Sequence, residues 1–499
     1  MPRLMAFSAP GFAARLAVAL LALGFASRLT AAEPAGFTLT ADPQALDAPF
    51  TGRVVVLLTK SKPNPLPKSL NWFNPEPAFA QDVTGWKPGT PLAVGAGGRA
   101  ITPLAKVPPG KWWATAVIDR DLGGISFAAS PGNVYSTPKQ VELPAADPVR
   151  LTLDQVYREP PLKDTDTVKF VTVESRLLTK FHGRPTVMTA GVILPPSFGK
   201  EPGRKYPVVY EIPGFGGDAT AARFMAGAKP GVLADGVEAI WVVLDANCRL
   251  GHHVFADSAN NGPVGQALVE ELIPYIEGKF RGDGRPGKRL VTGHSSGGWS
   301  SLWLQVTYPE VFGGCWSTSP DPVDFRDFQK VDIYDPGVSL FTDSGGNPRP
   351  LSRPSGGRRL MFKSFSDMER VMGRGGQLGS FEAVFSPKGP DGKPLELWDR
   401  DTGAINPKVA KAWEKYDIRL VLERSWPTLG PKLAGKLHVW MGEEDTFLLE
   451  GATKKLKKSL ADLGSDAVIE LFPGKTHALV DGKLRQRMKA EMAAALKKE

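Results

Sequence analysis

Residues 293–298 read Gly-His-Ser-Ser-Gly-Gly, and this stretch decides the fold that the sequence predicts. It directly follows the apolar run 289–292 and directly precedes the helix-like segment 299–307. Between a strand and a helix, small residues let the chain turn sharply and lift a serine hydroxyl above the end of a sheet. The helix amino terminus also favours negative charge that develops there. We therefore predict that Ser295 is a nucleophile. A glycine-rich phosphate loop is the alternative, but the segment lacks the Lys-Ser/Thr pair of such a loop.

The chain around this turn alternates between strand-like and helix-like segments. Residues 168–178 and 186–194 resemble a leading antiparallel pair, and 265–280 has apolar residues at helical spacing. Short apolar runs typical of strands buried on both faces lie at 207–213, 238–245, 288–293, 312–317, 436–442 and 467–473. The alternation predicts an α/β fold with a doubly wound, mostly parallel sheet.

The base that activates the serine is expected to be His477. A serine hydroxyl is a poor nucleophile until a neighbouring base removes its proton, and the chain contains only six histidines. His477 lies in a loop directly after the last apolar strand, where a base can hang over the sheet. The others lie next to the serine, before it in the chain or inside a predicted strand: His182, His252, His253, His294 and His438.

The acid of the predicted triad is Asp445. A carboxylate must orient the imidazole and stabilise its charged form. Asp445 follows the strand 436–441 and lies between the serine and His477 in the sequence, which is the order expected of this fold. The alternatives lie in the same turn or after the preceding strand: Glu443, Glu444, Asp321 and Asp324.

Two backbone amides are expected to bind the oxyanion. Fixed amides suit this task because they need no reorganisation when charge develops. Ser296, the residue after the nucleophile, provides one amide. Residues 213–217, Pro-Gly-Phe-Gly-Gly at the end of an earlier strand, provide the second, from Phe215 or alternatively from Gly216. A plain strand-end turn is the competing interpretation of this segment.

A polar and aromatic stretch at 245–263 follows a core strand at the edge of the sheet where ligands bind. Asp257, Asn260 and Asn261 are candidates for shaping the substrate pocket, beside Gly216. A loop that satisfies its own hydrogen bonds is the alternative. Asp and His occur together here, but their spacing matches no standard metal-ligand set. We expect no metal and no organic cofactor.

The chain of 499 residues is too long for one ordinary domain. Residues 1–32 resemble a signal peptide, because arginines precede an apolar run at 16–26 that is too short to span a membrane. Residues 33–150 contain short β-type runs and predict a small β-sandwich-like domain. Residues 151–499 form the catalytic domain. Its segment 320–430 is an insertion, either a lid over the substrate or a surface decoration.

Composition narrows the partners and the location. The net charge is +9, and it falls to +6 when Arg3, Arg15 and Arg28 leave with the signal peptide. The lysines near the C-terminus are typical of a solvated helix face, so no nucleic acid is expected. The mature chain has no apolar run long enough for a membrane span. Export places Cys248 and Cys315 in an oxidising compartment, where they form either a disulfide or two buried thiols.

Four segments together resemble the putative esterase family, which includes esterase D and enterochelin esterase. They are 213–217 (Pro-Gly-Phe-Gly-Gly), 270–276 (Glu-Glu-Leu-Ile-Pro-Tyr-Ile), 293–298 and 308–313 (Tyr-Pro-Glu-Val-Phe-Gly). The resemblance covers about residues 165–318 and 433–490. It implies the α/β-hydrolase fold, a Ser, Asp, His triad and hydrolysis of esters, or acyl transfer in some relatives. Pro213 stands where relatives often carry His, and the insertion is larger than usual, so substrate specificity does not transfer.

Three functions fit these features. The first is an exported serine carboxylesterase that acts on a small-molecule or polymer ester through an acyl-enzyme. The second is a serine peptidase of the prolyl-oligopeptidase kind, although the N-terminal region shows no propeller-like repeat. The third is a binding protein on a hydrolase scaffold, against which the intact Ser295, Asp445 and His477 argue.

Overall fold

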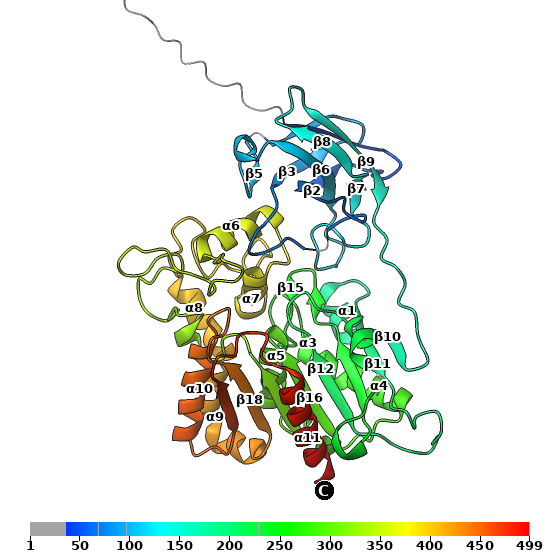
Figure 1. The fold of residues 1–499 in the computed structure, drawn as a ribbon, viewed down its shortest axis with the longest axis vertical. Coiled ribbons are helices and arrows are strands. Elements are labelled where there is room, and N and C mark those ends of the chain that lie inside the picture. Colours follow the sequence, from blue (N-terminus) through cyan, green and yellow to red (C-terminus); the bar gives the residue numbers. More distant parts are fainter. Residues whose placement is uncertain (1–35, 68, 96, 228–229, 499) are drawn as a thin grey trace, which may run out of the picture.

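The structure, a computed structural model, describes residues 36–498 except 68, 96 and 228–229. These residues form two large β-sheets and a two-stranded ribbon of β14 (Asn247–Cys248) and β15 (Gly251–His252). The first sheet extends from β1 (Phe37–Ala41) to β9 (Val149–Val156), and the second from β10 (Val168–Glu174) to β19 (Val468–Phe472). Figure 1 shows the first sheet above the second. The predicted signal peptide, residues 1–32, lies outside the described residues. None of the described helices is long and apolar enough to cross a bilayer.

The second sheet confirms the predicted α/β fold. Its eight strands have the order β10-β11-β13-β12-β16-β17-β18-β19. The pairs β10/β11 and β11/β13 are antiparallel, whereas all later neighbours are parallel. Parallel strands are covered by helices on both faces, which explains the continuous apolar runs in the sequence. The remaining strands are β11 (Val187–Ile193), β12 (Val208–Ile212), β13 (Ile240–Leu244), β16 (Arg289–His294), β17 (Gly314–Thr318) and β18 (Leu437–Gly442).

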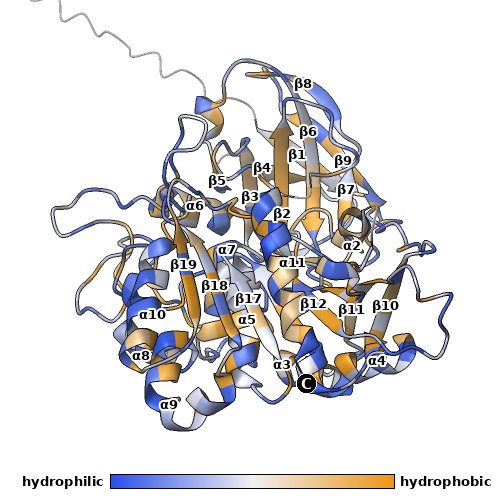
Figure 2. Cartoon of the chain, turned by 60° about the horizontal axis from the view of Figure 1, so that its bottom comes forward, coloured by the Kyte–Doolittle hydropathy of each residue, from blue (hydrophilic) through white to orange (hydrophobic). Residues whose placement is uncertain are grey.

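Alternate side chains of these strands fill two separate cores, because successive residues of a strand point to opposite faces. Val209 packs with Ala222 and Met492 on the face covered by α2 (Ala221–Ala226) and α11 (Gly482–Lys497). Figure 2 shows α11 lying across this face. Val208 and Tyr210 belong to the core on the other face. The helices there are α3 (Val264–Ala267), a π-helical turn (Leu268–Leu272), α4 (Ile273–Phe280), α5 (Ser296–Thr307), α9 (Ile418–Leu433) and α10 (Glu450–Asp462). A short helix, α1 (Arg176–His182), connects β10 to β11.

The N-terminal sheet curls over a core of its own. Its order is β4-β1-β9-β7-β6-β2-β3-β5, with β8 paired to β6. Phe37 of β1 and Phe79 of β3 are far apart in this order, yet their ring centroids are 5.6 Å apart. The sheet therefore folds back on itself, as in a sandwich. Its other strands are β2 (Phe50–Thr59), β3 (Ala78–Trp86), β4 (Leu92–Val94), β5 (Arg99–Ala100), β6 (Gly110–Asp119), β7 (Val134–Ser136) and β8 (Lys139–Leu143).

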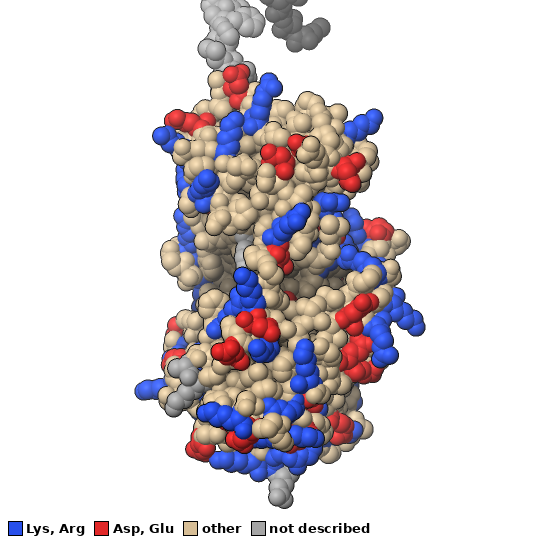
Figure 3. Space-filling model, turned by 90° about the vertical axis from the view of Figure 1, so that its right-hand side faces the viewer, with Lys and Arg blue, Asp and Glu red and all other residues tan. Residues whose placement is uncertain are grey.

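The N-terminal sheet also packs against the rest of the protein. Val55 and Leu57 of β2 point away from the inner core and join the large core of the α/β domain. Charges of both signs are interspersed over the face in Figure 3, which is hollowed between the two parts. A cavity of about 780 Å³ lies at this boundary, lined by Leu122 and Pro131 on one side and Asn261 on the other.

The insertion after β17 folds into three helices: α6 (Phe362–Met372), α7 (Gln377–Phe385) and α8 (Pro407–Trp413). Figure 1 shows α6 and α7 between the N-terminal sheet and the carboxyl ends of the α/β strands. The predicted limit at residue 430 falls inside α9 (Ile418–Leu433). α9 begins at Ile418 and packs on α5 and α10 of the α/β domain, and its Ile418 and Leu422 are buried in that domain's core. We call residues 320–417 the cap.

Candidate active site

Ser295 lies on a strained turn between β16 and α5. Its φ of 59° and ψ of −124° belong to a region that non-glycine residues seldom occupy. The Ser295 amide donates to the Thr318 carbonyl oxygen at 3.0 Å, which ties the turn to β17. A Cβ at Gly297 would lie 1.9 Å from the carbonyl oxygen of Ile212, so no larger residue fits there. The glycines of this motif are therefore required for the serine to project from the sheet edge.

His477 and Asp445 are directly hydrogen-bonded. His477 Nδ1 lies 2.7 Å from Asp445 Oδ2, and the side chains are 14% and 0% exposed. Asp445 follows β18 and His477 follows β19, at the same edge of the sheet as Ser295. The second oxygen of Asp445 accepts from the Phe447 amide at 2.8 Å. A carboxylate fixed on both oxygens can hold the imidazole in one tautomer, with Nε2 free to act as a base.

The other carboxylates that the sequence offered do not contact His477. Asp324 is paired with Arg326 and Arg419. Asp321 accepts from the Ser296 hydroxyl at 2.6 Å. The side chains of Glu443 and Glu444 make no hydrogen bond with the histidine, although their amides hold the turn to residues 472 and 475. Among these candidates, the geometry singles out Asp445.

His294 is a neighbour of the predicted base. Its ring centroid lies 4.8 Å from that of His477, and its Nδ1 lies 3.2 Å from the Thr318 hydroxyl oxygen. Burial, together with the nearby His477, lowers the pKa of His294 to about 4. His294 therefore remains neutral near pH 7 and adds no positive charge beside His477.

The two segments with the predicted oxyanion donors contact one another. A Cβ at Gly214 would lie 3.2 Å from Ser295 Cβ, so residues 213–217 pass directly beside the nucleophile. The Gly217 amide donates to the Gly214 carbonyl oxygen at 3.0 Å and closes a tight turn around Phe215. Ser296 is the first residue of α5. Phe215 and Ser296, whose amides are the predicted oxyanion donors, thus lie in segments that adjoin Ser295.

Ser295, Phe215 and His477 line one cavity of about 250 Å³. The cap contributes much of its wall through Leu351, Phe365, Gln377, Leu378 and Phe381. The sequence alone left open whether the insertion lies over the substrate. In the structure, eight residues of the cap line the cavity that Ser295 also lines, so the cap forms a wall of this cavity.

The N-terminal part contributes Trp72, which sequence reasoning missed. Its ring centroid lies 5.7 Å from that of Phe215, 5.1 Å from Phe365 and 6.0 Å from Phe447. Trp72 stands in the loop between β2 and β3, beside a second aromatic residue, Phe73. The sequence did contain one indication of this contact, because Trp72 and Phe73 are two adjacent aromatic residues in a loop rich in Pro and Asn. The N-terminal domain is therefore part of the pocket wall.

Four residues predicted to contact substrate do not line this cavity. Asp257 Oδ1 accepts from the amides of Gly265 and Gln266 and so caps α3. Asn260 donates to the carbonyl oxygens of Ala383 and Ser386, which anchors the cap helix α7. Asn261 lines the cavity at the domain boundary. Gly216 has a φ of 80° and shapes the turn around Phe215. A role of these residues in shaping the substrate pocket therefore stays a prediction, and the described contacts of Asp257 and Asn260 hold the loop to α3 and to the cap.

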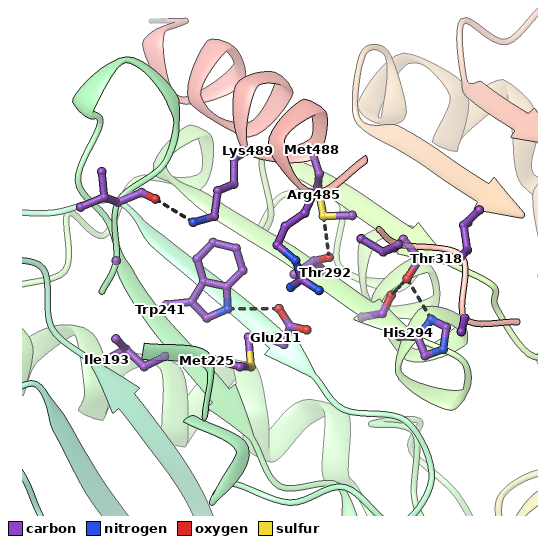
Figure 4. A pocket seen from close by; sticks show the side chains of 16 residues that line it. Ile193, Glu211, Met225, Trp241, Thr292, His294, Thr318, Arg485, Met488 and Lys489 are labelled. Carbon is purple, nitrogen blue, oxygen red and sulfur yellow. Dashed lines mark hydrogen bonds between the residues drawn. The ribbon is translucent and has the colours of Figure 1, made fainter. Parts of the chain in front are cut away.

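A second cavity, of about 340 Å³, lies behind the serine turn on the α11 face of the sheet. Figure 4 shows Trp241 directed at Glu211, with Arg485 and Met488 reaching down from α11. Trp241 Nε1 donates to Glu211 at 3.1 Å, and burial raises the pKa of Glu211 to about 7. His294 borders both cavities, but Ser295 and His477 line only the first. The first cavity is therefore the candidate active site.

Within residues 36–498 as described, no group of three or more His, Cys, Asp or Glu side chains could hold a metal ion. Cys248 and Cys315 are both free thiols. Burial raises the pKa of Cys248 to about 11 and that of Cys315 to about 12, so both remain protonated at neutral pH.

Ser295 stands on a strand-to-helix turn at the edge of a mostly parallel sheet, and a hydrogen-bonded histidine and carboxylate follow later strands at the same edge. This arrangement defines a serine hydrolase of the α/β-hydrolase class. The chain matches the family model described as "Putative esterase" over residues 184–461. The match exceeds half of the chain, and the protein belongs to this family of esterases.

Similar solved structures are distant in sequence. A ferulic acid esterase is 16% identical, with 66% of this chain and 98% of that chain covered and a TM-score of 0.41. An S-formylglutathione hydrolase from Agrobacterium tumefaciens is 15% identical, with 66% and 94% covered and a TM-score of 0.41. Dipeptidyl peptidase 4 of Porphyromonas gingivalis is 14% identical, with 84% and 46% covered and a TM-score of 0.37. A comparison with curated proteins finds no match.

Proposed function

We propose that this protein is an exported esterase that hydrolyses a carboxylic ester through Ser295, His477 and Asp445. The observation that carries the proposal is the 2.7 Å contact between His477 Nδ1 and Asp445 Oδ2 in a cavity that Ser295 also lines. The resemblance of residues 1–32 to a signal peptide supports the proposed location.

The reaction proceeds in two acyl transfers. His477 Nε2 takes the proton from the Ser295 hydroxyl as its oxygen attacks the ester carbonyl. The amides of Phe215 and Ser296 donate to the oxyanion, and Asp445 stabilises the imidazolium. His477 then gives its proton to the departing alcohol, which leaves an acyl group on Ser295. Water, deprotonated by His477, attacks this acyl-enzyme and releases the acid.

The substrate is a small-molecule ester or an ester group on a polymer. The cavity of about 250 Å³ accommodates only a short or ring-sized group beside the serine. Because aromatic rings from three parts of the chain surround it, the bound group is expected to present an apolar face.

Labelling with a fluorophosphonate probe and hydrolysis of para-nitrophenyl esters test the mechanism. The native protein is expected to be labelled once and to hydrolyse the esters. Ser295→Ala should lose labelling and at least about a thousandfold in kcat, with an unchanged melting temperature. Ser364→Ala, which removes an exposed hydroxyl of α6, should behave like the native protein. If the kcat of Ser295→Ala stayed within about tenfold of the native kcat, the assignment of Ser295 as the nucleophile would be refuted.

A further inference from the structure

The cavity contains a buried carboxylate that the mechanism does not use. Asp321 is 5% exposed and lines the cavity beside Ser295. Its Oδ2 accepts from the Ser296 hydroxyl at 2.6 Å and from Gln377 Nε2 at 3.3 Å. Its Oδ1 accepts no hydrogen bond from the described residues, and no Lys or Arg among them lies within ion-pair distance. A buried carboxylate without a counterion is costly unless a ligand supplies the missing charge.

Two amide oxygens in the same wall also lack partners. Gln377 Oε1 and Gln329 Oε1 are buried and have no hydrogen-bond donor among the described residues. The nitrogen of each amide is already used, because Gln377 Nε2 donates to Asp321 and Gln329 Nε2 donates to the Phe447 carbonyl oxygen at 3.1 Å. Both side chains line the cavity. An unpaired buried acceptor costs about 1–3 kcal/mol, so this wall is suited to a ligand that brings hydrogen-bond donors.

The rest of the lining is mostly apolar and rich in aromatic rings. Trp72 contacts Phe215, Phe365 and Phe447, and Phe381 also lines the cavity. The faces of such rings attract a cation placed against them. The lining includes no Lys or Arg that would repel one.

We propose that this cavity selects an ester that carries a protonated amine, bound by Asp321 with the amide oxygens of Gln377 and Gln329. The inference rests on the proposed esterase function and names its substrate class. A hydroxyl group could donate to the same oxygens, but it would leave the charge of Asp321 uncompensated. The amine satisfies both the acceptors and the charge.

Matched esters separate these two donors. Three para-nitrophenyl benzoates, with aminomethyl, hydroxymethyl or ethyl in the para position, have the same ring and nearly the same size. Three phenyl acetates with the same groups place the amine on the alcohol side instead. In one of the two series, kcat/KM for the aminomethyl ester should exceed that for the ethyl ester about tenfold to hundredfold. A preference for the hydroxymethyl ester, or no preference in either series, overturns the amine assignment.

The pH profile gives an independent signature. Burial raises the pKa of Asp321 to about 6. The hydrogen bonds from Ser296 and Gln377 and the charge of His477 lower this pKa, whereas the charge of Asp445 raises it further. His294 also borders the cavity and remains neutral. The aminomethyl and ethyl esters depend on the same proposed base, His477. The ionisation of this base therefore cancels in the ratio of the two kcat/KM values. The aminomethyl-to-ethyl ratio should therefore rise as pH increases through about 6, where Asp321 loses its proton. A flat ratio from about pH 5 to about pH 8 overturns the role of Asp321.

Asp321→Asn keeps the shape and the hydrogen bonds to Ser296 and Gln377 but removes the charge. It should reduce the aminomethyl-to-ethyl ratio about tenfold or more and abolish its pH dependence. Asp332→Asn, at a half-buried cap position outside the cavity, is the matched control and should keep the native ratio. An Asp321→Asn ratio that equals the native one overturns the proposal.

Binding without turnover distinguishes failure of the amine site from failure of the esterase function. Ser295→Ala should bind benzylamine about tenfold more tightly than benzyl alcohol in calorimetry. If the native protein hydrolysed the ethyl ester but Ser295→Ala bound benzylamine and benzyl alcohol equally tightly, only the amine site would be overturned. Absence of hydrolysis and of fluorophosphonate labelling would overturn the proposed function, and the benzylamine measurement would still decide the amine site.

Discussion

The α/β sheet and the walls above it are built on different principles. Ser295, Asp445 and His477 each follow a parallel strand, so the topology alone brings them to one edge. The walls come from a loop near residue 72 and a cap near residues 329–381, which only tertiary packing brings together. The proposed reacting groups are thus held by the framework, whereas the parts added around it line the cavity beside them. Changes in the two regions should therefore have different effects.

The largest effect is expected in the framework, on stability. Arg289 at the start of β16 forms a two-pronged buried ion pair with Glu277 of α4, with both contacts at 2.7 Å. Glu277→Gln leaves the guanidinium without its counterion, and breaking such a pair costs about 3–5 kcal/mol. We expect the free energy of unfolding, measured in urea, to fall by this amount. The kcat/KM ratio of aromatic to acetyl esters should not change at temperatures where the variant is folded.

Glu270→Gln is the control for this change. Glu270 is an exposed acid of the preceding π-helical turn, and its replacement should shift stability by less than about 0.5 kcal/mol. If Glu277→Gln changed the ratio of kcat/KM for aromatic and acetyl esters without lowering the free energy of unfolding, the framework would also determine substrate preference, which contradicts the comparison.

A smaller effect, on selectivity alone, is expected from the N-terminal wall. Trp72→Ala removes the ring that contacts Phe215, Phe365 and Phe447. Loss of this apolar surface should cost about 1.5–3 kcal/mol of transition-state binding for a benzoyl ester, which is about tenfold to hundredfold in kcat/KM. An acetyl ester, which does not reach the ring, should lose less. Parallel kinetics with para-nitrophenyl benzoate and acetate measure the difference.

Trp113→Ala provides the matched control, because Trp113 belongs to the same domain but lies on β6 beside Lys62, outside the cavity. Its benzoate-to-acetate ratio should equal that of the native protein. An equal loss for both esters in Trp72→Ala would mean that the loop supports the fold and does not select the substrate.

The sequence predicted the framework well for a physical reason. The turn at Ser295 needs glycines where backbones approach within contact distance, and this requirement is visible in the local sequence. Asp445 and His477 were candidates because each follows an apolar strand, and the structure brings the two side chains into contact at the same edge of the sheet.

The walls could not be predicted in the same way. Trp72 and Gln377 are about three hundred positions apart, and no local pattern states that they face one cavity. Asn260 shows the same limit, because a polar loop at the ligand-binding edge has the same composition whether it binds substrate or anchors a cap helix. The end of the insertion could not be located from sequence either, since it depends on the packing of α9 on α5.

The smallest effect is expected where the two regions meet. Arg353 of the cap donates to the Asp445 carbonyl oxygen and to both oxygens of Glu450 on α10, at 3.1 Å and 2.8 Å. Lys330 of the cap reaches the same Glu450 carboxylate at 2.8 Å. The cap therefore braces the backbone that presents Asp445, the proposed catalytic acid. Glu450 is 4% exposed, and the two cations hold its pKa below the ordinary value despite burial.

Arg353→Ala removes this brace without touching the substrate cavity, whose lining does not include Arg353. A slight displacement of the Asp445 loop misorients His477, and such misplacement costs rate more than binding. We expect kcat to fall about tenfold for benzoyl and acetyl esters alike, with KM unchanged, because the acid acts on both. Arg353→Lys should restore part of kcat, since an ammonium can reach one acceptor but not all three. Arg359→Ala, an exposed change in the same cap segment, should leave kcat unaltered. A change in KM or in the benzoate-to-acetate ratio of kcat/KM would show that Arg353 affects substrate binding. An unchanged kcat would show that the contact of the cap with the Asp445 loop does not affect catalysis.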